Sequence, residues 1–113
     1  SSYIVACRDK NKFSECGMVS TGVKEKESEG VTYNEITKLL KPLIIKEEGK
    51  RVYVKPKIII EVGYEEIQKS PTYSSGYALR FPRVNLLRTD KPLSEINTIN
   101  DIERIYKNQR GKK

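Results

Sequence analysis

Hydrophobic and polar residues alternate along much of the chain with the two-residue period of β-strands. The strands predicted in this way cover residues 3–7, 13–18, 43–45, 51–54, 57–67 and 77–81. Short polar turns separate the first two strands and the next two, so each pair predicts a hairpin. Gly63 interrupts the long strand 57–67, where it predicts a bulge or a bend. The pattern is that of a mainly-β protein.

Two segments have helical periodicity instead. Thr32 followed by Glu35 forms a capping-box pattern, and apolar residues then recur at helical spacing until Lys41-Pro42 ends the helix. Thr98 and Asp101 repeat that pattern before a C-terminal amphipathic helix. The apolar stripe of the first helix is short, which favours core packing over a partner groove. Residues 19–30 are predicted to be a polar loop and residues 108–113 a frayed tail.

Together these elements predict an OB-fold, a small Greek-key β-barrel with one internal helix and one C-terminal helix. A length of 113 residues suits a single domain over residues 1–113. The chain does not begin with Met, so we expect a domain excised from a longer protein.

The distribution of charge along the chain indicates the kind of partner that it binds. The net charge is +7, and residues 70–113 hold nine basic against four acidic side chains. A localised basic excess is typical of a polyanion-binding surface, although a solvated basic face has the same composition. The chain has two cysteines without a CxxC pair and no histidine, which argues against a zinc site and a disulfide framework. We expect an intracellular protein without a membrane span or signal peptide.

The candidate chemistry lies between Arg80 and Lys91. Three of the seven arginines, Arg80, Arg83 and Arg88, lie where a strand is expected to lead into a basic loop. Guanidinium groups match phosphate oxygens. Phe81 precedes Pro82, at which a central strand cannot continue, so Phe81 is either a wedge in a DNA groove or a core residue. The residues alone favour the core position.

Five blocks of residues occur in the order seen in one enzyme family. They are Leu39-Leu40-Lys41-Pro42-Leu43, Val54-x-Pro56 with Glu61-Val62, Ser70-Pro71-x-Tyr73, Ala78-Leu79-Arg80-Phe81-Pro82-Arg83, and Arg88-x-Asp90-Lys91. Over nearly its whole length the chain therefore resembles the C-terminal OB domain of archaeal-type ATP-dependent DNA ligases. This resemblance starts at the second strand of that family's barrel, so we expect an incomplete barrel or a strand-paired dimer.

The resemblance implies a role for each candidate residue. Residues 80–91 correspond to nucleotidyltransferase motif VI, in which Arg88, Asp90 and Lys91 face the ATP phosphates during lysine adenylation. Arg80 and Phe81 then contact the minor groove at a nick, which reverses the core preference for Phe81. Arg83 is either a further phosphate contact or the partner that holds Asp90. Asp90 itself is either a nucleotide contact or half of an internal ion pair.

The resemblance also implies what the longer enzyme needs. It would use ATP and a divalent metal (Mg) to seal nicked double-stranded DNA in replication, repair and recombination, in the cytoplasm and beside the nucleoid. The family's nucleophilic lysine lies in a K-x-D-G motif that is absent here, so we expect no catalytic residue and no bound metal or cofactor in this chain. The adenylation and DNA-binding domains are expected upstream.

Two other functions compete with this one. A free-standing OB module could bind single-stranded nucleic acid by stacking bases on its tyrosines, namely Tyr33, Tyr53, Tyr64, Tyr73 and Tyr77. An OB domain of an RNA ligase or capping enzyme would share a basic terminal motif. The Arg80-Phe81-Pro82-Arg83 block argues against the second alternative.

Overall fold

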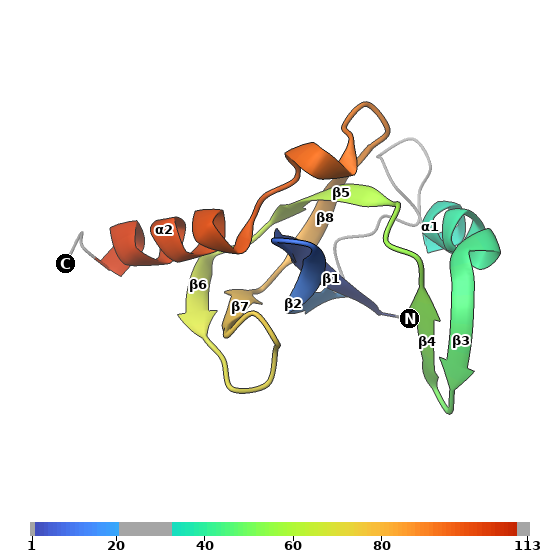
Figure 1. The fold of residues 1–113 in the computed structure, drawn as a ribbon, viewed down its shortest axis with the longest axis horizontal. Coiled ribbons are helices and arrows are strands. Elements are labelled where there is room, and N and C mark those ends of the chain that lie inside the picture. The colour runs from blue at the N-terminus through green and yellow to red at the C-terminus, as the bar shows by residue number, and fades with distance from the viewer. Residues whose placement is uncertain (1, 21–32, 111–113) are drawn as a thin grey trace.

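A computed structural model describes residues 2–20 and 33–110 of the chain (Figure 1). The strands are β1 (Tyr3–Asp9), β2 (Lys12–Val19), β3 (Ile44–Glu48), β4 (Arg51–Val54), β5 (Ile59–Gly63), β6 (Glu66–Lys69), β7 (Tyr77–Arg80) and β8 (Arg83–Arg88). The helices are α1 (Tyr33–Leu40) and α2 (Ile99–Arg110), with short 3₁₀ turns η2 (Lys41–Leu43) and η3 (Leu93–Glu95). The mainly-β fold with an internal and a C-terminal helix is confirmed.

The strands pair antiparallel as β1–β2, β3–β4, β5–β8 and β6–β7. The first two pairs are the hairpins that the alternation predicted. Within the described residues these ladders do not join into one closed barrel. Near the C-terminal end of β1, Arg8 also forms an isolated parallel bridge with Thr98.

The predicted long strand is divided at a bend. It becomes β5 and β6, and the chain changes pairing partner from β8 to β7 just after Gly63. Across the break, the Glu65 amide donates to the Arg80 carbonyl at 2.9 Å, so the two ladders form one bent ribbon. A Cβ on Gly63 would lie 2.8 Å from Asn85 Nδ2, so glycine makes room for that side chain.

The expectation of a basic loop after Phe81 was wrong, because residues 83–88 form strand β8. Val84 lies opposite Val62 and Leu87 opposite Ile60, and all four pack in one apolar cluster. Val84 and Leu87 are three positions apart, and the register shift that leaves Asn85 as an extra residue lets both pack in the core. Their packing accounts for the strand. The arginines at the two ends of β8 are thereby fixed to a sheet.

Two apolar clusters form the core. The first is built on Val19, Ile36 and Val84, and the second on Cys7, Cys16, Ile67 and Ile102. Ile36 of α1 is buried, which confirms the core-packing interpretation of the first helical stripe. Ile102 of α2 is buried as well. Both cysteines are buried free thiols, and hydrogen bonding to Cys7 together with burial raises the pKa of Cys16.

Helix α2 is held at both ends. Thr98 Oγ1 accepts from the Asp101 amide at 3.2 Å and the Thr98 amide donates to the Asp101 carboxylate at 2.9 Å, which confirms the capping box. At the other end, the Gln109 side chain accepts from the Ile67 amide at 3.1 Å and donates to the Ile67 carbonyl. Residues 108–110 of the expected tail thus belong to α2. The cap at Thr32, the loop residues 21–30 and residues 111–113 lie outside the described residues.

Candidate functional site

The basic segment, residues 80–91, crosses the bend of the ribbon and then follows β8. Arg80 ends β7, and Arg83 begins β8 opposite Gly63. Phe81 and Pro82 belong to neither strand and lie between the two ladders. The bend therefore places Arg80 on one side of Phe81-Pro82 and Arg83 on the other, at the surface of a packed sheet.

Phe81 is the most unusual residue of this segment. Its φ is +52°, in the left-handed region, and its residue surface is 61% exposed. That backbone conformation costs a residue with a side chain about 1–2 kcal/mol. The core position favoured by the residues alone was therefore wrong, and the exposed position implied by the resemblance is the observed one. An exposed aromatic on a strained backbone is typical of a contact site.

Arg80 is held on two sides. Its Nη1 lies 2.8 Å from Glu66 Oε2, and its guanidinium carbon lies 5.1 Å from the centroid of the Phe81 ring. Glu66 is the residue opposite Arg80 in the β6–β7 ladder. Glu66 has no signal in the sequence, because its role depends on the register between two strands that sequence alone does not set.

Arg88 and Asp90 form the second feature of the segment. Arg88 Nε and Nη2 donate to the two carboxylate oxygens of Asp90, each at 3.0 Å, and Arg88 Nη1 lies 3.7 Å from Glu61. The hydrogen bonds from Arg88, together with a backbone hydrogen bond, lower the pKa of Asp90 to about 2. This bidentate geometry fixes the plane of the guanidinium group.

Arg83 and Lys91 are engaged differently. Within the described residues neither forms an ion pair, and the carboxylate of Asp90 holds Arg88 instead of Arg83. Arg83 is exposed, whereas Lys91 is partly buried just after β8. The charge of Lys91 also contributes to the lowered pKa of Asp90. These two cations can take up an external anion without breaking an internal ion pair of the described part.

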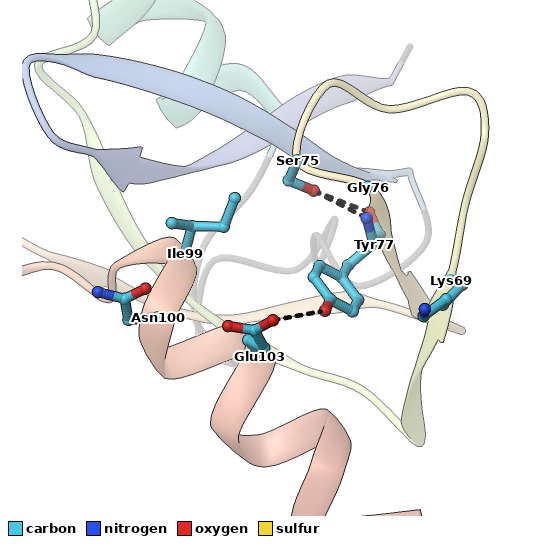
Figure 2. Close-up of a pocket in the computed structure, with 7 residues that line it drawn as sticks. All are labelled: Lys69, Ser75, Gly76, Tyr77, Ile99, Asn100 and Glu103. Carbon is cyan, nitrogen blue, oxygen red and sulfur yellow. Dashed lines mark hydrogen bonds between the residues drawn. The ribbon is translucent and has the colours of Figure 1, made fainter.

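A shallow cavity of about 400 Å³ lies apart from this segment, between α2 and the connection from β6 to β7 (Figure 2). Its polar groups bond to one another. The Tyr77 hydroxyl donates to Glu103 at 3.5 Å, and the Ser75 hydroxyl accepts from the Tyr77 amide at 3.1 Å. In residues 2–20 and 33–110 no group of three or more Asp, Glu, His or Cys could hold a metal ion, and no helix is long and apolar enough to cross a membrane.

Comparison with known proteins gives a consistent result. A family model described as the ATP dependent DNA ligase C terminal region matches residues 1–91. The chain is 55% identical to a DNA ligase of Nanoarchaeum equitans, over 98% of the chain and 20% of that relative. It is 48% identical to a DNA ligase of Methanothrix thermoacetophila, again over 98% of the chain and 20% of the relative. For a DNA ligase of Archaeoglobus fulgidus the identity is 47%, over 96% and 19% respectively.

The chain thus spans about one fifth of the length of these relatives. Its mainly-β fold, with one helix between strands and one at the C-terminal end, is the OB-fold of the matched region. The chain belongs to the family of C-terminal regions of ATP-dependent DNA ligases.

Proposed function

We propose that this chain is the OB domain of an ATP-dependent DNA ligase, and that it uses the basic segment in two successive steps. In the first step the domain closes over ATP while a lysine elsewhere in the protein is adenylated. In the second it binds a nicked duplex while the 3′-hydroxyl and the 5′-phosphate are joined. The exposed, left-handed Phe81 is the observation that carries this proposal, because the core of the chain gains little from it.

The DNA-facing step uses Arg80 and Phe81. An exposed aromatic beside a groove can insert between base or sugar edges, and a neighbouring arginine can neutralise backbone phosphates. Arg80 is already oriented by Glu66 and stacked on the Phe81 ring, so little side-chain freedom is lost when DNA binds. The fixed orientation of Arg80 against the Phe81 ring supports a contact near the nick.

The ATP-facing step uses Arg88, Asp90, Lys91 and Arg83. In phosphoryl-type transfer, positioned positive charges stabilise the charge that develops on the phosphates and on departing pyrophosphate. Asp90 orients Arg88 by a bidentate ion pair, and Arg83 and Lys91 supply cations that no carboxylate of the described residues pairs with. All four act by electrostatic positioning, since the sequence has no K-x-D-G lysine to form the covalent adenylate.

The whole enzyme is part of the same proposal. We place residues 1–113 as one domain that follows adenylation and DNA-binding domains, and carboxylates of those domains would hold the Mg ions that the reaction requires. The DNA substrate would place the protein beside the chromosome in the cytoplasm, in replication, repair and recombination. Pairing of the outer edge of β1 with a second copy also stays a proposal, which sedimentation of the purified protein would test.

Binding of single strands by stacked tyrosines is less well supported. Tyr64 and Tyr77 pack against the second core cluster and Tyr53 lies on the separate β3–β4 hairpin, so the three do not share a stacking surface. The test compares the affinity of the full-length protein for nicked duplex, intact duplex and single strands across salt concentrations. A preference for the nicked duplex that is lost in Phe81→Ala would support the ligase hypothesis. A preference for single strands would refute it.

A further inference from the structure

The connection from β8 to α2, residues 89–98, carries Asp90 and Lys91 (orange in Figure 1). Its regular part is the short turn η3, in which the Glu95 amide donates to the Pro92 carbonyl at 3.0 Å. A local hydrogen bond of this kind sets the shape of a turn but not its position on the domain. The position of the connection therefore depends on contacts with other elements.

Arg8 of β1 holds this connection at two points. Its backbone amide donates to the Asn97 carbonyl at 3.0 Å, beside the parallel bridge to Thr98. Its side-chain Nη2 donates to the Ser94 carbonyl, also at 3.0 Å. One of the two carbonyls lies within η3 and the other just beyond it, so a single residue of β1 fixes the turn against the first hairpin.

Arg8 itself is firmly placed in the fold. It follows Cys7, which is 3% exposed in the second core cluster, and it pairs with Phe13 in the β1–β2 ladder. Its Nε is buried without a hydrogen-bond partner among the described residues. A guanidinium group with a buried Nε and an Nη2 bonded to a carbonyl is directed at the protein, so Arg8 is suited to position the backbone and not to bind a phosphate.

Lys91 is thereby held from both sides. On its N-terminal side, β8 pairs with β5 as far as Arg88, and Arg88 binds Asp90. On its C-terminal side, Ser94 lies three residues away and is bonded to Arg8. We propose that Arg8 is a positioning residue for self-adenylation, which holds the backbone at Lys91 so that its ammonium group meets the ATP phosphates. This inference rests on the proposed function, since it requires Lys91 to face ATP.

A purely structural contact is the alternative. Asn97 leads directly into the capping box of α2, so the hydrogen bonds of Arg8 also hold that helix. A contact that only stabilised the domain would not favour one reaction step over the other. Gln109, at the other end of α2, makes a contact of that kind with the backbone of Ile67. It supplies a matched control that lies outside the basic segment.

The test replaces Arg8 with methionine in the full-length protein. This change keeps the backbone hydrogen bond to Asn97 and a long side chain, but it removes the donor to Ser94. Single-turnover rates of self-adenylation at saturating ATP and of sealing of adenylated nicked duplex are compared where urea unfolding shows each variant to be folded. Misplacement of a reacting group by about 1 Å can cost about 100-fold in rate, so we expect adenylation to slow by at least about tenfold and sealing by less than about twofold. Gln109→Ala should change neither rate.

Three further variants separate position from charge. Arg8→Lys keeps a charged donor and should recover most of the adenylation rate. Lys12→Met removes a charge from the exposed start of β2 and should leave that rate unchanged. In a Lys91→Ala background, Arg8→Met should slow adenylation no further, because Arg8 acts through Lys91.

Equal slowing of adenylation and sealing by Arg8→Met would overturn the inference, and so would an unchanged adenylation rate. A full effect of Arg8→Met in the Lys91→Ala background would show that Arg8 does not act through Lys91. An equal loss in Lys12→Met would assign the effect to charge and would also overturn the inference. Failure of the proposed function is distinct from these results, since it would appear as an adenylation rate that Lys91→Ala leaves unchanged.

Discussion

Replacing Phe81 with glycine and with alanine separates backbone strain from DNA contact. Phe81 has a φ of +52°, for which glycine has no steric penalty, whereas alanine retains it. Either change removes the aromatic ring. The two variants therefore differ chiefly in backbone strain, and both lack the side chain that we assign to the nick.

The magnitudes follow from exposure. Full burial of a Phe side chain is worth about 1.5–3 kcal/mol, so a residue that is 61% exposed contributes about 0.6–1.2 kcal/mol. The contact with Arg80 adds about 0.5–1 kcal/mol at an exposed site. Phe81→Ala loses both terms and keeps the strain, so we expect destabilisation of about 1–2 kcal/mol. Phe81→Gly regains about 1–2 kcal/mol of strain but loses about 0.4–1 kcal/mol to a freer unfolded chain.

Urea unfolding at 25 °C should therefore find the glycine variant about 1 kcal/mol more stable than the alanine variant, with equal m values. Both variants should lose the preference for nicked over intact duplex to the same extent. An alanine variant as stable as the glycine variant would refute the inference that the backbone at Phe81 is strained. A glycine variant that keeps the preference for nicked DNA would refute the role of the ring.

Two further predictions concern contacts around the site. Hydrogen bonds from Arg88 hold the pKa of Asp90 at about 2, below its ordinary 3.8, so the ion pair contributes fully above pH 3.8 and is lost as pH falls through 2. Arg88→Ala should return the NMR titration of the Asp90 carboxyl toward 3.8, and an unmoved titration would contradict the pairing. Gln109→Ala should lower the free energy of unfolding by about 1–3 kcal/mol and speed hydrogen exchange at Ile67, while the exposed Asn108→Ala changes neither. Equal effects of the two substitutions would exclude the Gln109 contact.

The elements that the sequence predicted well are those with a local cause. The capping box of Thr98 and Asp101, the two hairpins and the bend after Gly63 depend on residues a few positions apart, and each is present in the structure. The same local argument failed for residues 83–88. The arginines and the proline at positions 80–88 indicated a loop, but packing of Val84 and Leu87 against β5 makes residues 83–88 a strand.

The side chains that orient the site depend on strand register instead. Glu66 reaches Arg80, and Glu61 approaches Arg88, only because β6 pairs with β7 and β5 with β8 in a particular alignment. A shift by one residue would turn each carboxylate to the other face of its sheet. The position of Phe81 has the same origin, since its exposure follows from the break between two ladders and not from its hydrophobicity.

The central claim is that the basic segment serves two separate steps, and the most direct test measures both steps in one full-length protein. Single-turnover rates are needed for self-adenylation with ATP and for sealing of a nicked duplex that already carries the adenylate. We expect Lys91→Ala to slow self-adenylation much more than sealing, and Phe81→Ala to slow chiefly sealing. Equal slowing of both steps by both substitutions would contradict the division of the segment into an ATP-facing and a DNA-facing part.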